Sequence, residues 1–328
     1  MYTTTAKKCT ALCLCLLLAC LPFSCKGAEF FPEDTAAFLR QAVPNPSIGQ
    51  TGGEWAVIGH LQAGIPKDDP YFSIYKDNLE KTLKEKAGVL SGNKYTEYAR
   101  VSLALSALGE DPSNFRGFDL LAPLCEFDKV LRQGINGAVF ALMAFSHGGR
   151  GDEEVVCRYL TELLGKQQAC GGFGLSDDQP DTDVTAMSIR ALCLYPGHAG
   201  VRDAVMAALA WLSAVQQADG GFLSREGTET AESASQVLLA LKAAGYSEND
   251  PAFCKNGSSV RDNLLSFAQP NGGFRHTKQN LPVDLMASEQ AYLALTAPAA
   301  YTFDSDKAWD FIRTLLDLSA QMQKGGNP

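Results

Sequence analysis

A short motif recurs along the chain and limits the folds that the chain can adopt. In each full copy a helical pattern runs into Gly-Gly-Phe, at 171–173, 220–222 and 272–274, and a partial copy at 52–55 reads Gly-Gly-Glu-Trp. Glycine suits this place because a helix end needs a positive φ and a second backbone passes close by. We therefore expect Gly221 to have a positive φ, where Gly221→Val would be strained. A unit repeated in this way predicts a repeat architecture.

Two kinds of helix alternate between these motifs. The first kind is small and apolar on nearly all sides, as buried helices are, and spans residues 55–63, 95–108, 135–146, 185–195, 233–244 and 285–297. The second kind is amphipathic and spans residues 71–86, 120–131, 152–168, 201–217, 260–267 and 306–322, after a short helix at 31–43. Strand patterns with a period of two residues are absent.

This alternation predicts an all-α fold. An open array of helix pairs would leave its apolar ends uncovered, whereas a ring of buried helices within a ring of amphipathic ones covers them. The predicted architecture is therefore an α/α toroid, a closed barrel of six inner and about six outer helices, formed by a single domain over residues 28–328.

The composition supports a globular chain and excludes one class of partner. Apolar residues form 46% of the 328 residues, which is enough for a large core. The net charge of −9, with no basic stripe, argues against a nucleic-acid partner. Five of the ten cysteines lie within residues 1–27, and the others have no framework spacing, so a disulfide scaffold is not expected.

Residues 1–27 have the features of a leader for export. Lys7 and Lys8 precede an apolar run at 10–23 that is too short to span a bilayer comfortably. Residues 17–20 end in Cys20 and match a bacterial lipobox, which predicts Cys20 as a lipid anchor. The alternative is ordinary signal-peptide cleavage near Ala28. Both predict an exported protein, either held at the cell surface through its lipid or leader, or secreted.

The motif copy from Leu212 to Phe222 resembles the QW-type repeat of squalene–hopene cyclases and the related repeat of protein prenyltransferase β subunits. The resemblance covers nearly all of the chain after the leader. The same superfamily of toroids includes cobalamin carriers and the thioester domains of complement proteins, and the chain looks most like exported bacterial toroid proteins. Because these proteins share a fold and differ in function, the resemblance implies the toroid more strongly than any activity.

A second motif, at residues 181–186, resembles the Asp-x-Asp-Asp-Thr-Ala motif of squalene–hopene cyclases, with Val184 in place of the last Asp. In that family the middle Asp is a general acid, which implies that Asp183 is the proton donor and Asp181 its neighbour. The other interpretation is helix capping, since Asp near a helix start accepts free N–H groups and favours the macrodipole. Capping is favoured, and it predicts an ionised Asp183 with a depressed pKa and a tolerated Asp183→Asn substitution.

Other chemistries of the superfamily lack their residues in this chain. Residues 177–181 spell the DDxxD motif of class I terpenoid enzymes, but Pro180 makes this segment a loop, with at most a weak cation site. A prenyltransferase zinc site would need an Asp-x-Cys at an inner-helix start, and the four histidines have no ligand spacing. The thioester sequence Cys-Gly-Glu-Gln is absent. The sequence therefore predicts no metal and no cofactor.

Aromatic and polar side chains at the starts of the inner helices are expected to gather at one mouth of the barrel. A concavity with aromatic walls and a few polar groups is typical of a ligand site. The candidates are Glu54, Trp55, Tyr95, Glu97, Tyr98, Asn136, Glu229, Glu232, Asp284, Glu289 and Gln290. The motif residues Phe173, Phe222 and Phe274 are expected to wedge between helices instead.

Three functions stay open on these observations. The favoured one is a non-catalytic, exported and membrane-anchored toroid that binds a small molecule or a protein partner in its cavity, as the cobalamin carriers do. The alternative is a terpenoid cyclase with Asp183 as general acid. Val184 counts against it, as does the single helical domain, because class II cyclases set their site between two. The third is a surface adhesion or assembly module, which the sequence does not separate from the first.

Overall fold

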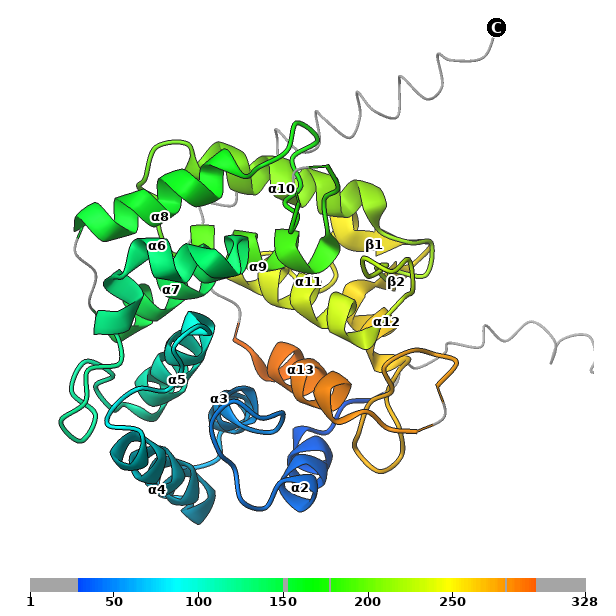
Figure 1. Ribbon diagram of the computed structural model, residues 1–328. Coiled ribbons are helices and arrows are strands. Elements are labelled where there is room, and N and C mark those ends of the chain that lie inside the picture. Colours follow the sequence, from blue (N-terminus) through cyan, green and yellow to red (C-terminus); the bar gives the residue numbers. More distant parts are fainter. Residues whose placement is uncertain (1–28, 150–152, 177, 281, 299–328) are drawn as a thin grey trace, which may run out of the picture.

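The computed structural model describes residues 29–298 except 150–152, 177 and 281, and it is mostly helical (Figure 1). The prediction of a helical, toroid-like fold is confirmed. The leader with Cys20 and the helix expected at 306–322 lie outside the described residues.

The described elements follow the expected alternation closely. The α-helices are α2 (Pro32–Ala42), α3 (Glu54–Gln62), α4 (Pro70–Glu85), α5 (Tyr95–Leu108), α6 (Phe127–Val130), α7 (Ile135–Gly148), α8 (Glu153–Gly165), α9 (Thr182–Leu192), α10 (Val201–Val215), α11 (Ala231–Ala243), α12 (Val260–Leu265) and α13 (Leu285–Thr296). The 3-10 helices are η2 (Ala122–Cys125), η3 (Leu131–Gln133) and η4 (Pro251–Phe253), and the strands are β1 (Cys254–Lys255) and β2 (Ser258–Ser259).

Helices α3, α5, α7, α9, α11 and α13, here called the central helices, form the middle of the molecule. Each contacts the next in chain order, and α13 also contacts α3. Small buried side chains such as Ala56, Ala104, Ala186 and Ala240 allow these close contacts. Helices α2, α8, α10 and α12 pack against α13, α7, α9 and α11 in turn. Figure 1 shows these four helices and α4 around the central ones.

Two segments differ from the sequence prediction. The helix expected at 120–131 is broken into η2, α6 and η3, and Pro123 in the first turn of η2 explains part of the break because it donates no N–H. Strands β1 and β2 form a hairpin that was not predicted. Its turn is Asn256-Gly257, with φ values of 49° and 83°, a pair that favours such two-residue turns.

The repeated motif makes the same turn in its three full copies. The N–H groups of Gln168, Gln217 and Gln269 donate to the second glycine of each pair at 2.8–2.9 Å. The first glycine, not the second, has the positive φ, which is 86° at Gly220. Gly221 is required for a different reason than expected: a Cβ there would lie 2.5 Å from the Glu229 carboxylate.

The phenylalanine that ends each motif copy is buried. Phe173 and Phe222 are fully enclosed, and Phe274 is 1% exposed. The backbone N–H of Phe173 donates to Thr185 Oγ1 at 2.9 Å, which ties the turn to α9, and that of Phe274 donates to Ser288 Oγ at 2.8 Å. The backbone at Phe173 and Phe274 thus ties two of the loops to central helices, and all three phenylalanine rings pack in the hydrophobic core.

Candidate functional site

Three central helices line a cavity of about 710 Å³ at their N-terminal ends. Each helix contributes two side chains one turn apart: Asp183 and Met187 from α9, Glu232 and Gln236 from α11, and Met286 and Gln290 from α13. The loops at 224–228 and 276–280 complete the wall with Ser224, Glu226, Thr228, His276, Thr277 and Asn280. We call this end, with Asp183, Glu226 and Glu232, the acid mouth.

The carboxyl group of Asp183 is the most perturbed group of the acid mouth. Burial, opposed by a hydrogen bond from Ser233 and reinforced by the charges of Asp181, Glu232 and Glu226, raises the pKa of Asp183 to about 6. Its Oδ1 atom is buried and has no hydrogen-bond partner among the described residues. A carboxyl group with this pKa keeps its proton up to about pH 6, in a side chain that lines the cavity.

The capping role belongs to Asp181 and not to Asp183. Asp181 is the N-cap of α9, 8% exposed, and its Oδ1 accepts from the Val184 N–H at 2.8 Å. Asp183 lies in the first turn of the same helix, where its side chain faces the cavity. The expectation of a depressed pKa at Asp183 is therefore wrong in direction, because the hydrogen bonds that would lower the pKa go to the neighbouring Asp.

A histidine–carboxylate pair faces Asp183 from α11 and the 276–280 loop. His276 Nδ1 lies 2.9 Å from both carboxylate oxygens of Glu232. Burial raises the pKa of Glu232, and the His276 hydrogen bond opposes that shift. With Nδ1–H donated to Glu232, the Nε2 atom of His276 is left as an acceptor, so the pair can take up a proton.

The floor of the acid mouth is a chain of hydrogen bonds across three helices. Gln236 donates to Gln290 at 2.9 Å, and Arg190 donates to Gln236 at 3.2 Å. Beyond this floor a narrow space of about 150 Å³ is lined by Trp55, Phe140 and the same polar groups. The rings of Trp55 and Phe140 are 6.0 Å apart. Aromatic side chains thus border the acid mouth only at its deep end.

The structure gives several of the predicted site residues structural roles. Glu289 is 3% exposed, and its Oε1 accepts from the N–H groups of Gly52 and Ala56, so it caps α3 from α13. Burial raises the pKa of Glu289 to about 7 despite these bonds. Glu54 is buried and accepts from the Gly49 N–H, and Asp284 is the N-cap of α13.

The remaining predicted residues are spread over different places. Glu229 accepts from Asn263 and pairs with Lys278 at 2.6 Å, outside the cavity. Tyr95 and Tyr98 line a separate surface pocket with Lys129 and Arg132. Burial, and to a smaller extent the charge of Glu97, raises the pKa of Glu54. Asn136 has a buried Oδ1 without a partner among the described side chains. Only Asp183, Glu232, Gln290 and, at the deep end, Trp55 share the central space.

Sequence reasoning missed His276, Gln236, Met187 and Arg190. His276 comes from a loop far along the chain, and no spacing links it to Glu232. Met187 and Gln236 could have been found from the sequence, because each of them, like the predicted Gln290, follows a first-turn residue of a central helix by four positions. Arg190 is one more turn along α9.

The described residues contain neither a metal-binding cluster nor a membrane-spanning helix. They contain no group of three or more His, Cys, Asp or Glu side chains placed to hold a metal ion. Asp177, the first residue of the DDxxD sequence, is not among the described residues, and Asp178 is exposed. No helix in this part of the chain has the length and hydropathy needed to cross a bilayer.

Comparison with solved structures identifies a fold. The chain is similar to the type II terpene cyclase MstE from Scytonema, in its apo form, with a TM-score of 0.51 and 14% identity over 81% of this chain and 95% of that one. A second MstE structure, in complex with the product merosterolic acid A, gives 0.52 and 15% over the same shares. No family model and no curated protein sequence matches the chain. At this identity the likeness concerns the fold alone.

Proposed function

We propose that the protein is a terpenoid-cyclase-like enzyme that binds an isoprenoid chain along its central helices and protonates it with Asp183. The observation that carries this proposal is the Asp183 carboxyl group, which has an unpartnered buried oxygen and a pKa raised to about 6, and lines a cavity of about 710 Å³. A proton donor must hold its proton at the working pH and lie in reach of the substrate. Burial raises the pKa of Asp183 to about 6, so it meets the first condition at a mildly acidic working pH.

The proposed barrel is closed, with the six central helices inside and the amphipathic helices outside. The contact of α13 with α3 supports closure, because it joins the last central helix to the first. The likeness to MstE supports a cyclase of this size. The single helical domain counts against a cyclase in the sequence, but the similarity covers 95% of the MstE chain, which is a type II terpene cyclase.

The proposed reaction is an isomerisation. The Asp183 carboxyl group gives its proton to a terminal carbon–carbon double bond, so that a C–H bond forms, the π bond breaks and a tertiary cation remains. A second double bond attacks the cation and closes a ring. A proton then leaves the final cation to the Nε2 atom of His276, and it returns to Asp183 through the Glu232 side of the cavity. The net change adds and removes one proton, so no oxidant or cofactor is needed.

Product analysis on matched variants tests this proposal. The full chain would be incubated with squalene and with geranylgeranyl and farnesyl derivatives, and the products separated by mass. Cyclised product should form with the wild type and with Asp284→Asn, which keeps the cap of α13, and should be lost with Asp183→Asn. Folded protein without cyclised product from any of these substrates would contradict the proposal, as would full activity of Asp183→Asn.

A second candidate is a toroid that binds its ligand without turnover. It is favoured by the lining of the acid mouth, where Met187 and Met286 are the apolar members and the rest are polar. A carbocation is better stabilised by aromatic faces, and these lie only at the deep end. Native mass spectrometry of protein from its own cell separates the two, because an unmodified bound compound with no turnover supports binding alone.

Export remains part of the proposal. A lipid on Cys20 would hold the toroid at the cell surface, whereas cleavage near Ala28 would release it. The intact mass of the membrane-extracted protein distinguishes them, since an acylated Cys20 adds the mass of its lipid chains. A chain that still begins at Met1 would contradict both processing routes.

A further inference from the structure

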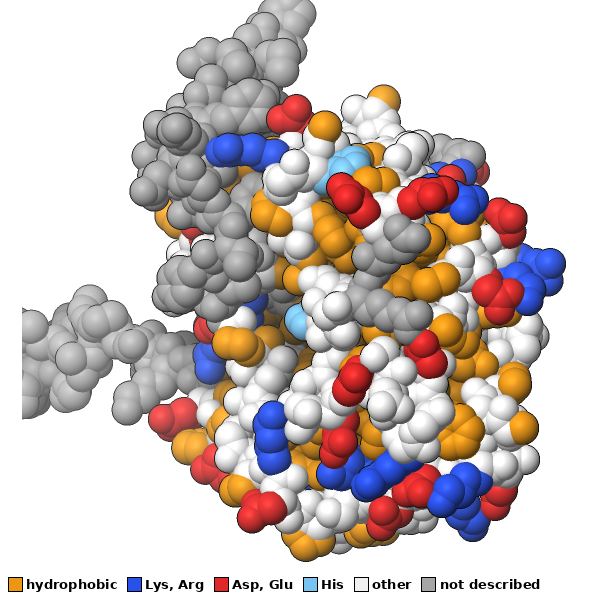
Figure 2. Space-filling view, turned by 90° about the vertical axis from the view of Figure 1, so that its left-hand side faces the viewer, with side chains coloured by type: hydrophobic (Ala, Val, Ile, Leu, Met, Phe, Trp, Pro, Cys, Tyr) orange, Lys and Arg blue, Asp and Glu red, His pale blue; other side chains and the backbone are white. Residues whose placement is uncertain are grey.

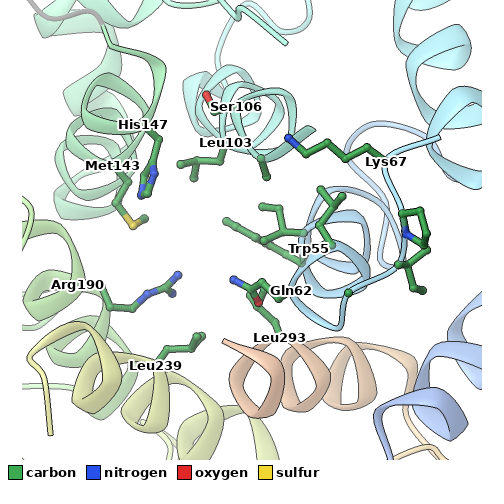
Figure 3. A pocket seen from close by; sticks show the side chains of 16 residues that line it. Trp55, Gln62, Lys67, Leu103, Ser106, Met143, His147, Arg190, Leu239 and Leu293 are labelled. Atoms are coloured by element: carbon green, nitrogen blue, oxygen red, sulfur yellow. The ribbon is translucent and has the colours of Figure 1, made fainter. Parts of the chain in front are cut away.

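A second cavity, of about 570 Å³, lies at the opposite ends of the central helices and is not used by the proposed reaction. All six central helices contribute side chains to it, as Figure 3 shows for Leu103, Met143, Leu239 and Leu293. Its walls are mainly apolar, and Trp55 lies between this cavity and the narrow space below the acid mouth. A volume of this size is within the range of roughly 300–1,000 Å³ typical of small-molecule sites.

Arg190 places a positive charge in this apolar space. Figure 3 shows its guanidinium group extending from α9 into the cavity. Its hydrogen bond goes to the neutral Gln236, and no carboxylate pairs with it in the described part of the chain. Burial lowers the pKa of Arg190 to about 10, so it stays cationic at neutral pH. A cation facing an apolar cavity without a counter-ion is costly unless a ligand supplies the negative charge.

Lys242 shows what a purely structural cation looks like at this end of the molecule. It lies in the last turn of α11, is 6% exposed, and donates to the carbonyl oxygens of Ala294 and Ala297 at the end of α13. Glu248 pairs with it at 3.0 Å. Arg190 is also in the last turn of its helix, where the macrodipole favours a cation, but it makes none of these contacts.

The other polar groups around this cavity are donors or neutral. His147, Lys67, Gln62 and Ser106 line it, and no Asp or Glu side chain does so among the described residues. The Ser106 Oγ atom has no hydrogen-bond partner in that part of the chain. Burial, and then the Arg190 charge, lowers the pKa of His147, so a bound anion would reverse the second effect.

We propose that this second cavity binds a single-chain amphiphile with an anionic headgroup, a carboxylate or a phosphate monoester. The headgroup pairs with Arg190, within reach of His147, and the apolar chain lies against Trp55, Leu103 and Met143. Charge-assisted bonds to a guanidinium group are stronger than bonds between neutral groups. This inference does not depend on the proposed reaction, because it concerns binding at the other end of the central helices; Arg190 and Trp55 border the narrow space below the acid mouth but do not line the 710 Å³ cavity itself.

Fluorescence quenching on the full chain tests the site. The chain has three tryptophans, and of the two among the described residues, Trp55 and Trp211, only Trp55 lines this cavity. Dibromostearate, a fatty acid with bromines in mid-chain, should quench the Trp55 emission with saturation. The corresponding dibromo alcohol should bind about tenfold more weakly or worse, because it lacks the charge. The Trp55→Phe variant should lose the quenched component.

Variants of Arg190 decide whether the charge recognises the ligand. Arg190→Gln should bring the acid and the alcohol within about threefold of each other, whereas Arg190→Lys should keep most of the preference. Arg202→Gln, on the exposed side of α10, is the matched control and should behave as wild type. Displacement by farnesyl phosphate or by palmitate tells which headgroup is preferred, and either supports the shared chemistry.

Several results would overturn the proposal. Equal affinity of the wild type for the acid and the alcohol would show that the negative charge of the ligand is not recognised. An unchanged preference for the acid in Arg190→Gln would show that Arg190 does not recognise it. Quenching that persists in Trp55→Phe would place the ligand elsewhere. If Arg190→Gln does not fold, the comparison of acid and alcohol on the wild type and the Trp55→Phe result still decide the question.

Discussion

The two ends of the central helices differ in charge, and the helices themselves explain part of the difference. The first turns of α9 and α11 give the carboxylates of Asp183 and Glu232 to the acid mouth, and the last turns of α7 and α9 give His147 and Arg190 to the second cavity. Parallel helices present partial positive charge at their N-termini and partial negative charge at their C-termini. Side chains of opposite charge are stabilised at each end.

The macrodipole does not explain which charged side chains are free. At the acid mouth Asp181 accepts a backbone N–H, whereas Asp183 leaves an oxygen without a partner. At the opposite end Lys242 is bonded to carbonyl oxygens, whereas Arg190 extends into a cavity. Each end thus has one charge that serves the helix and one that is available to a ligand. The hydrogen-bond partners, and not the position along the helix, distinguish the two.

The face of the molecule that Figure 2 shows has no such separation. Figure 2 shows acidic and basic side chains interspersed on one face of the molecule. Pairs such as Lys76 with Glu110 at 2.9 Å and Arg261 with Glu248 at 3.2 Å are partly exposed. Exposed pairs of this kind contribute about 0–1 kcal/mol each. The separation of charge along the central helices is therefore a feature of the interior.

The largest effect is expected from the turn that carries the acid-mouth loop. In Gly220→Val the new Cβ would lie 2.5 Å from the Ser259 carbonyl oxygen, at a φ of 86°. Strain and overpacking together should cost about 4 kcal/mol of unfolding free energy. Gly221→Val should cost about half as much, because Glu229 and Asn263 can move aside.

Urea unfolding of Gly220→Val and Gly221→Val measures the difference in their unfolding free energies. Ligand binding shows which cavity the substitution has altered. The acid mouth depends on the loops at 224–228 and 276–280, whereas the second cavity depends mainly on helix ends. Gly220→Val should therefore retain Trp55 quenching by dibromostearate whenever it is folded. Equal costs for the two glycines would contradict the assignment of the positive φ to Gly220.

The next effect concerns Glu289, which links α13 to the start of α3. Glu289→Ala removes the acceptor of two buried N–H groups, from Gly52 and Ala56, and should cost about 3 kcal/mol. Glu289→Gln keeps an oxygen in place and loses a buried charge, so it should change the unfolding free energy by less than about 1 kcal/mol. Thermal unfolding at pH 8 compares the two. Similar losses of unfolding free energy in Glu289→Ala and Glu289→Gln would show that the negative charge of Glu289 is needed to cap α3.

The helical fold could be predicted from the sequence because the residue patterns that identify a helix lie within the helix itself. The buried segments at 95–108 and 285–297 agree with α5 and α13 to within one residue, since small apolar residues identify a central helix without knowledge of its neighbours. The broken helix after Leu120 was missed because Pro123 and the contacts of that segment outweigh its amphipathic pattern. The hairpin turn at Asn256-Gly257 was visible in the sequence and was overlooked.

The candidate site was predicted only in part, since burial and partners depend on tertiary contacts. Asp181 and Asp183 are two residues apart and look alike in the sequence, yet only one of them caps the helix. The desolvation that raises the pKa of Asp183 comes from α11 and its loops, at least forty residues away. For the same reason the sequence does not indicate that Arg190 lacks a carboxylate partner.

Replacing Lys242 and Arg190 by methionine, one at a time, tests which of these two cations stabilises the fold. Lys242→Met leaves the last carbonyl oxygens of α13 without a buried donor and should cost about 2 kcal/mol. Arg190→Met removes an unpaired charge from an apolar cavity and should be neutral or stabilising by up to about 1 kcal/mol. The midpoints of urea unfolding measure both changes in unfolding free energy, provided that the variants and the wild type have the same dependence on urea concentration. A large loss in Arg190→Met would mean that the guanidinium group is structural.

The pH dependence of Asp183→Asn should follow from its raised pKa. The folded chain holds this proton up to about pH 6, while the unfolded chain releases it near its ordinary value of 3.8. The stabilisation is therefore complete below the unfolded pKa and is lost as the pH rises through 6. Asp183→Asn should match the wild type at pH 4 and exceed it by about 1–3 kcal/mol at pH 8. If the wild type is more stable than Asp183→Asn at pH 8, the pKa of Asp183 is lowered in the folded chain and not raised.

The smallest effects are expected at the N-caps beside the acid mouth. Asp181 accepts the Val184 N–H, and Asp284 accepts the Ala287 N–H at 2.9 Å, so either cap should tolerate Asn within about 0.5 kcal/mol. Replacement by Ala should cost about 1 kcal/mol at each position, because the N–H groups lose their acceptor. Asp181→Asn should also lower the pKa of Asp183, since the Asp181 charge contributes to its rise. Infrared titration of the Asp183 carboxyl group in this variant measures the shift. An unchanged pKa would mean that burial and the other two carboxylates hold the proton on Asp183 without help from the cap.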